Sequence, residues 1–303
     1  IRSSNSGEGP VKRHLSLAAL ALLGGMTLAA CGSDDESSDS TSADSTAASA
    51  EQGAEASSDA DAAEQAEEST TAEAEPLRVL VTNDDGVGAP GIAALVSALL
   101  ARTDVAVTVV APAENQSSTG GSTIARPRVQ TNTTTAGGAP AVAIAGFPAD
   151  SVIWALDEGG MAQKPDLVIS GINLGQNVGP LIEISGTVGA ARAAASRGIP
   201  ALATSLGIGD PMQWETAVNI TMQWLDENLA DIRADDHDEP GPLWNLNIAN
   251  CAQSRGIVVV DPAAATDGRN GVVVTCDSTA TDPVDDIDAL INGFAPLSEL
   301  KLD

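Results

Sequence analysis

The sequence has few basic residues: 14 Lys and Arg stand against 42 Asp and Glu, which gives a formal net charge of −28 over 303 residues. Binding of DNA or RNA depends on clustered Lys and Arg side chains that displace counterions from the phosphate backbone. We therefore expect no stable nucleic-acid partner. A small anionic substrate remains compatible with this charge if a metal ion and backbone N–H groups supply a local positive field. Adaptation to a salty habitat would explain the shortage of Lys equally well.

The apolar run near the N-terminus, Leu15 to Leu23, is too short to cross a bilayer, which needs about 20 residues. It follows Lys12-Arg13 and precedes small residues, a pattern typical of a secretory signal. Leu28-Ala-Ala-Cys31 resembles the lipobox of bacterial lipoproteins, in which the cysteine is acylated. We therefore expect a lipoprotein signal peptide at residues 1–31, with lipidation at Cys31. Because Ile1 is not a usual initiator, we expect translation to start at Val11 or a nearby codon.

Residues 32–76 contain fourteen acidic residues and no Lys or Arg, and they have almost nothing to bury. This composition predicts a disordered acidic tether between the anchor and the folded domain. The protein would then be exported and held by its lipid to a bacterial membrane, at the cell surface or on the periplasmic face.

Only three cysteines are present. With Cys31 assigned to the anchor, Cys251 and Cys276 remain in an exported domain, where disulfides persist. An antiparallel pairing of the apolar runs at Ile257–Val260 and Val272–Thr275 would bring these two cysteines together. Two alternatives follow: a Cys251–Cys276 disulfide, or two buried thiols.

From residue 77 onward, apolar β-branched runs alternate with segments rich in Ala and Leu. This alternation predicts an α/β fold, with a Rossmann-like parallel sheet covered by helices on both faces. We expect one domain at residues 77–303, with its core at 77–250 and a small β-containing appendage at 251–303. The predicted strands are Val79–Thr82, Val105–Ala111, Val142–Ile144, Leu167–Ser170, Ala201–Ser205 and Leu243–Ile248, and the predicted helices are Pro90–Ala101, Pro148–Leu156, Thr187–Arg197 and Pro211–Leu229.

Oxygen-bearing side chains follow several of these strands. Asp84 and Asp85 come directly after the first strand, Ser117 lies in a hydroxyl- and Gly-rich loop after the second, and Asn173 follows the fourth. The carboxyl ends of parallel strands meet at one edge of the sheet, where open α/β proteins bind their ligands. Two carboxylates, a hydroxyl and a carboxamide suit Mg²⁺ or Mn²⁺ rather than zinc. Taken alone, Asn-Asp-Asp-Gly also fits a simple turn.

The segment Ser185-Gly186-Thr187 offers N–H groups and hydroxyls at the start of a predicted helix. Such a segment binds phosphate, or it serves as an N-cap followed by close helix packing. A cation site beside a phosphate site indicates a phosphohydrolase. A histidine mechanism is excluded, because His14 lies in the signal and His237 in a charged loop.

Four motifs, in this order, resemble those of the SurE family, the stationary-phase survival proteins. The motifs are Asn83-Asp-Asp-Gly-Val-Gly-Ala-Pro-Gly91, Ala111-Pro-x-x-Asn-x-Ser117, Ser170-Gly-Ile-Asn-x-Gly-x-Asn177 and Ser185-Gly-Thr-Val-x-Ala-Ala191. The resemblance implies a Rossmann-like core and a metal-dependent phosphatase that acts on nucleoside 5′- or 3′-monophosphates.

The resemblance also implies roles for individual residues. One divalent cation per subunit, Mg²⁺ or Mn²⁺, would be bound by Asp84, Asp85, Ser117 and Asn173, with the two carboxylates as the catalytic residues. Ser118, beside Ser117, is an alternative ligand. The residues around the phosphate would be Asn83, Asn177, Ser185, Gly186 and Thr187.

The chain departs from the family in three respects. Ala193 stands where the family commonly has an acidic residue, so the detailed properties of the site need not carry over from the family to this chain. The C-terminal third matches weakly, so the arm through which these proteins oligomerise is expected to be reduced, although a homodimer remains open. Family members are usually cytosolic, whereas this chain carries an export and lipidation signal.

A competing interpretation is a solute-binding lipoprotein that captures a phosphorylated small molecule without turning it over. The acidic pair Asp84 and Asp85 discriminates between the two, because a pure binder of anions gains nothing from two carboxylates in its pocket.

Overall fold

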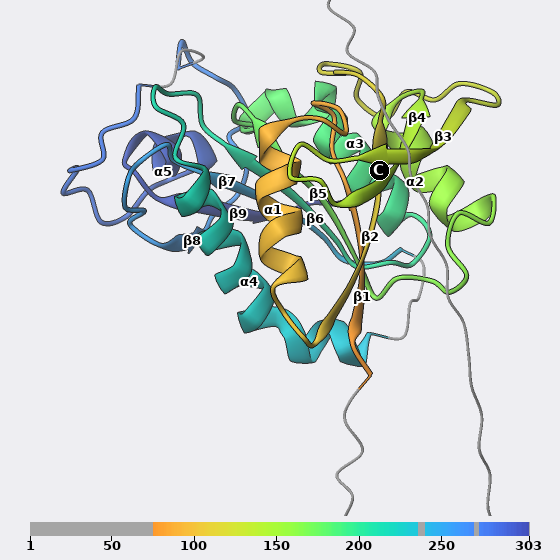
Figure 1. Ribbon diagram of the computed structural model, residues 1–303. Coiled ribbons are helices and arrows are strands. Elements are labelled where there is room, and N and C mark those ends of the chain that lie inside the picture. Colours follow the sequence, from red (N-terminus) through yellow and green to blue (C-terminus); the bar gives the residue numbers. More distant parts are fainter. Residues whose placement is uncertain (1–74, 236–239, 270–272, 303) are drawn as a thin grey trace, which may run out of the picture. The chain divides into compact units, whose positions relative to one another are not determined.

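Nine strands form a single mixed sheet within the described part of the chain, with helices packed on both of its faces (Figure 1). The computed structural model describes residues 75–235, 240–269 and 273–302. The predicted signal peptide with Cys31, nearly all of the predicted tether and His237 lie outside these residues. No helix in the described ranges combines the length and the apolar character needed to cross a membrane.

The sheet has the strand order β3-β4-β2-β1-β5-β6-β7-β9-β8, and it is parallel from β4 through β7. The antiparallel pairs are β3–β4 and β7–β9, near the two edges. The strands are β1 (Leu77–Thr82), β2 (Val105–Pro112), β3 (Arg128–Thr134), β4 (Pro140–Ala145), β5 (Leu167–Leu174), β6 (Ala201–Leu206), β7 (Leu243–Ile248), β8 (Ile257–Val259) and β9 (Ala295–Glu299). The helices are α1 (Pro90–Leu100), α2 (Pro148–Asp157), the 3₁₀ helix η1 (Gly179–Ile184), α3 (Gly186–Ala195), α4 (Trp214–Ala234) and α5 (Asp286–Ile291).

Both faces of the central strands are buried. Alternate side chains of a strand point to opposite faces, so Val79 and Val81 of β1 pack with α1 and α4, whereas Leu80 packs with α2 and α3. Figure 1 shows α1 and α4 together on one side of the sheet. Pro90 and Pro148 each stand in the first turn of their helices, where a missing N–H leaves no hydrogen bond unmade. The predicted α/β fold with a largely parallel sheet is confirmed.

The structure departs from the prediction at the start of helix α4 and at strand β3. Helix α4 begins at Trp214 rather than at Pro211, because Asn250 holds the preceding residues as a loop. Its Nδ2 donates to the Pro211 carbonyl at 3.0 Å and its Oδ1 accepts from the Gln213 N–H at 2.8 Å. Strand β3 was not predicted, because its residues are polar and almost all exposed and form no apolar run.

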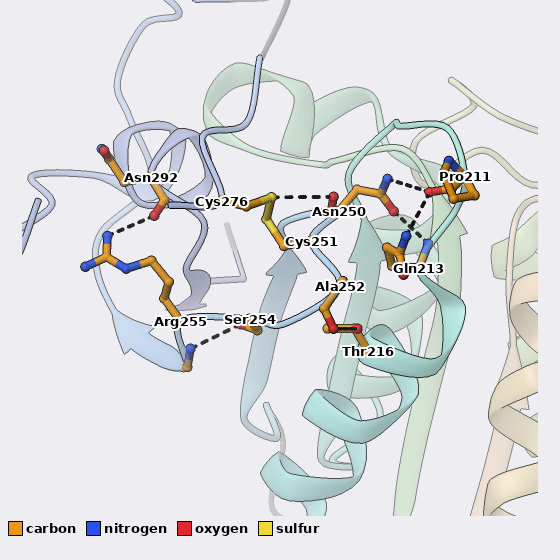
Figure 2. Close-up of a disulfide and its surroundings, with 11 residues drawn as sticks. Pro211, Gln213, Thr216, Asn250, Cys251, Ala252, Ser254, Arg255, Cys276 and Asn292 are labelled. Carbon is orange, nitrogen blue, oxygen red and sulfur yellow. Dashed lines mark hydrogen bonds between the residues drawn. A yellow bond between two sulfur atoms is a disulfide. The ribbon is translucent and has the colours of Figure 1, made fainter. Parts of the chain in front are cut away.

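A disulfide joins Cys251 and Cys276, with a Cα–Cα distance of 5.7 Å (Figure 2). The expected antiparallel pairing is wrong: β8 pairs with β9 in parallel, and residues 273–276 form no strand. The cysteines meet because Cys251 closely follows β7, while Thr275 donates its N–H to the Ile291 carbonyl at 2.7 Å, at the end of α5. The C-terminal segment is thereby attached to the end of β7.

Candidate active site

The central pair of strands, β1 and β5, marks a change of direction in the sheet. From β1 the chain moves outward to β2 and then to β4, and it returns to pair β5 on the opposite side of β1. The loops that follow β1 and β5 therefore diverge and leave a crevice at the carboxyl ends of the strands. Predicted site residues from three strands lie at this edge.

The loop after β1 turns sharply at Gly86, whose φ is +98°. A side chain there would be strained by this φ, and its Cβ would lie 3.0 Å from the backbone of Glu114. The close approach lets the loop after β2 pair with the loop after β1, through the Gln116 N–H and the Asp84 carbonyl at 2.7 Å. The Asn83 side chain stabilises the turn by donating to the Gly86 carbonyl at 2.9 Å.

Asp84 is buried, with only 3% of its surface exposed. Burial raises the pKa of its carboxyl to about 6, partly opposed by a hydrogen bond from the Thr187 hydroxyl, and the charge of Asp85 raises it further. The Thr187 hydroxyl donates to Asp84 Oδ1 at 2.7 Å. A carboxylate held in this environment favours a nearby positive charge.

Asp85 is less buried, and both of its oxygens accept hydrogen bonds. The Leu174 N–H donates to Oδ2 at 2.8 Å, and Asn115 Nδ2 donates to Oδ1 at 3.2 Å. Burial raises the pKa of Asp85, and these two bonds oppose the change. The contacts fix the carboxylate between the loop after β2 and the end of β5.

A cavity of about 190 Å³ is lined by Asp84. Larger hollows of about 400 and 480 Å³ flank the Glu183 carboxylate, but Arg192 already binds that carboxylate at 2.7 Å. The smaller cavity is lined by predicted ligands from separate loops: Asp84, Ser117, Asn173, Asn177 and Ser185, together with Ser118. The structure thus brings five of the predicted site residues together, and either serine can face the cavity.

The remaining predicted site residues lie around this cavity. Asp85 lines an adjoining hollow with Asn115 and Leu174. Thr187 is fully buried behind Asp84, and Asn83 is fully buried in the turn. Their roles as phosphate ligands remain predictions.

Helix α3 begins at the cavity. Its N-cap Ser185 accepts a hydrogen bond from the Val188 N–H at 3.1 Å, which is the N-cap geometry. Gly186 is required for space, because a Cβ there would lie 2.9 Å from Asp84 Cβ and 3.0 Å from its Oδ2. The helix start, whose N–H groups carry partial positive charge, therefore packs directly on the buried carboxylate.

Two buried asparagines of β7 hold Asn177 in place. Asn247 Oδ1 accepts from the Asn177 N–H at 2.7 Å, and the Asn177 carbonyl accepts from Asn245 Nδ2 at 2.8 Å and from Asn247 Nδ2 at 3.1 Å. The Asn177 amide donates to the Ser205 hydroxyl at 2.9 Å. The two asparagines were not among the predicted site residues, although alternating Asn in the otherwise apolar Leu243-Trp-Asn-Leu-Asn-Ile248 was the available signal.

The donor atoms of the site suit a small divalent cation. In the described ranges, no three His, Cys, Asp or Glu side chains gather closely enough to hold a metal ion. A cation here would therefore need the neutral oxygens of Asn173 and of a serine beside the two carboxylates, a set that hard cations accept. Among the described residues, no Lys or Arg lines the cavity to neutralise Asp84. Burying an uncompensated carboxylate is costly, and a bound cation would relieve that cost.

The fold and the site define an α/β protein with an acidic, oxygen-lined site at the carboxyl ends of a parallel sheet. The sequence model of the family described as "Survival protein SurE" matches residues 79–267. The crystal structure of the SurE protein from Aquifex aeolicus is similar, with a TM-score of 0.59 at 26% identity, over 75% of this chain and 94% of that one. The chain belongs to the SurE family.

Two curated relatives carry the name 5′-nucleotidase SurE. The protein from Methanopyrus kandleri is 46% identical over 134 residues, which are 44% of this chain and 50% of that protein. The protein from Prochlorococcus marinus (strain MIT 9313) is 41% identical over 179 residues, which are 58% of this chain and 64% of that protein. The chain thus spans half to nearly two thirds of the length of these relatives.

Proposed function

We propose that the protein is a divalent-metal-dependent phosphatase that hydrolyses nucleoside 5′-monophosphates, and also 3′-monophosphates, to nucleoside and phosphate. The observation that carries this proposal is the carboxylate pair Asp84 and Asp85 beside the neutral oxygens of Ser117 and Asn173. Membership of the SurE family and the name 5′-nucleotidase, which two relatives carry, support the substrate class.

The four residues Asp84, Asp85, Ser117 and Asn173 would hold Mg²⁺ or Mn²⁺. When bound, such a cation polarises the phosphoryl oxygens and lowers the pKa of a coordinated water. Asp85, the more accessible carboxylate, is fixed by the Leu174 N–H and by Asn115. In this proposal, Asp85 would accept a hydrogen bond from the attacking water and orient that water toward phosphorus.

The phosphate itself would be bound by other groups that line the same cavity. The Ser185 hydroxyl and the start of α3 provide donors and a partial positive charge. Asn177 adds its side chain, and the bonds from Asn245 and Asn247 keep its backbone in one position. These groups would bind and orient the ester without a cationic side chain from the described part of the lining.

Release of phosphate from a panel of esters tests this function. We expect turnover of nucleoside monophosphates in Mg²⁺ or Mn²⁺, slower turnover of a generic aryl phosphate, and none in chelator. Calorimetry on the same samples measures ligand binding. A protein that binds nucleoside monophosphates but releases no phosphate would be the solute-binding lipoprotein instead.

We also propose that the protein is exported and anchored through Cys31 to a bacterial membrane. The Leu28-Ala-Ala-Cys31 motif supports this, as does the disulfide Cys251–Cys276, because disulfides persist outside the reducing cytosol. Cells fed a labelled fatty acid should transfer label to the wild-type protein and not to Cys31→Ser. Equal labelling of both proteins would refute the anchor.

A further inference from the structure

Three exposed apolar side chains surround the mouth of the cavity. Leu174 and Ile184 line the cavity and are 46% and 52% exposed, and Ile208 is 66% exposed. Ile208 belongs to the same group because it lies over Gly175, which also lines the cavity. A Cβ built on Gly175 would lie 3.7 Å from Ile208 Cγ1. We call these three side chains the apolar rim.

The loop that carries Ile208 is held at both ends. The Ile208 N–H donates to Gln176 Oε1 at 3.3 Å, and the Gly207 N–H donates to the Ile248 carbonyl at 2.8 Å. Farther along, Asn250 binds Pro211 and Gln213 from a position next to the disulfide (Figure 2). The exposure of Ile208 is therefore built into the loop by contacts on either side.

The cavity is too small for a whole nucleotide. Its volume of about 190 Å³ is below the roughly 300 Å³ at which pockets for small organic molecules begin. Its floor is polar and suits the phosphate and a cation. The remainder of the ester would then lie outside this cavity, and the apolar rim offers it a contact surface there.

We propose that Leu174, Ile184 and Ile208 form the leaving-group subsite and that the rim binds the flat, uncharged face of a nucleobase. This inference rests on the proposed function, and it identifies Ile208 as a residue that determines specificity. Every nucleobase has an apolar face, so the rim selects for the presence of a base and only weakly for its identity. The part of the chain that the structure describes contributes no Lys or Arg to the cavity lining, so additional phosphates gain no cationic partner from it.

Calorimetric binding to the full-length chain in chelator, where the proposed function gives no hydrolysis, tests the subsite with two probes that differ by the base, adenosine 5′-monophosphate and ribose 5-phosphate. We expect the wild type to bind the base-bearing probe at least about tenfold more tightly. Ile208→Ser should reduce that preference about fivefold to tenfold by removing apolar contact area, with no change in affinity for ribose 5-phosphate. Ile208→Leu should retain the preference.

Two further variants complete the test. Ile184→Ser should lower the preference in the same direction. Val284→Ser, at a position that is 80% exposed and forms no part of the rim, should leave it unchanged. Equal affinity of the wild type for both probes would overturn the subsite, as would an equal loss for both probes in Ile208→Ser.

A third result would reassign the rim. If Ile208→Ser lowers the sedimentation mass and leaves the preference intact, the rim is a contact between two copies of the chain and the subsite is refuted. Turnover separates the two proposals. A wild type that prefers the base-bearing probe but releases no phosphate refutes the phosphatase and supports the subsite.

Discussion

Replacement of Asp84 by Asn removes a buried negative charge and keeps the shape of the side chain. The amide oxygen can still accept the hydrogen bond from the Thr187 hydroxyl, which is 2.7 Å long in the wild type. Burial raises the pKa of the carboxyl from 3.8 to about 6. One pKa unit corresponds to about 1.4 kcal/mol, so ionised Asp84 costs the metal-free folded protein up to about 3 kcal/mol at pH 7.

The raised pKa determines the sign of the pH dependence. Between pH values of about 4 and 6, the folded state binds more protons at Asp84 than the unfolded state does, so this carboxyl makes stability fall as pH rises. Above pH 6 the penalty is complete. We therefore expect Asp84→Asn to stabilise the metal-free protein at pH 7, by roughly 5–10 °C in Tm, with the gain disappearing near pH 4.

Thermal unfolding followed by circular dichroism measures both effects, in chelator and in Mg²⁺ or Mn²⁺. The wild type should gain stability with the cation, whereas Asp84→Asn should gain little, because one of its charged ligands is lost. Asp231→Asn, on the exposed face of α4, is the matched control and should behave as the wild type. A lower Tm for metal-free Asp84→Asn at pH 7, or an undiminished cation effect, would refute the argument from the buried carboxylate.

Three further variants test the supports of the site. Gly186→Ala places a Cβ 2.9 Å from Asp84 Cβ, so phosphate release should fall roughly a hundredfold with unchanged circular dichroism; full activity would show that the helix start tolerates the shift. Joint replacement of Cys251 and Cys276 by Ser opens a loop with a sequence separation of 25 and should lower the free energy of unfolding by about 3 kcal/mol. Reductant should bring the wild type to the same value, and a persistent difference would point to another cause. Asn247→Leu removes two buried hydrogen bonds to Asn177, and KM for the nucleotide should rise more than kcat falls; the reverse pattern would indicate a direct role in the chemical step.

The sheet was predictable where apolar runs are long and buried. The strands β1, β5 and β6 are apolar on both faces, so the sequence marks them clearly. The exposed polar strand β3 has no such mark, because its place at the edge requires no apolar face. The predicted start of α4 was wrong because the loop before the helix is fixed by Asn250. This residue lies 37 positions beyond its partner Gln213 in the sequence.

The site followed the same rule. The acidic pair, Ser117 and Asn173 were predictable as a group because each lies at or just after the end of a strand, and parallel strands bring these ends together. The asparagines of β7 were not predictable, because their partner Asn177 lies 70 residues away from Asn247 in the sequence. The contact of Asp286 was unpredictable for the same reason: its carboxylate accepts a hydrogen bond from the Gly179 N–H at 2.7 Å, and the two residues are 107 positions apart. Local patterns contain no information about such contacts.

Phosphate release by Asp85→Asn is the most direct test of the central claim. The full-length wild type, Asp85→Asn and the control Asp231→Asn would be assayed with a nucleoside monophosphate in Mg²⁺, in Mn²⁺ and in chelator. The account predicts cation-dependent turnover by the wild type and the control, and a loss of about a hundredfold or more in folded Asp85→Asn. Turnover that persists in chelator, or that survives this substitution, would contradict the assignment of Asp84 and Asp85 as the metal-binding catalytic pair.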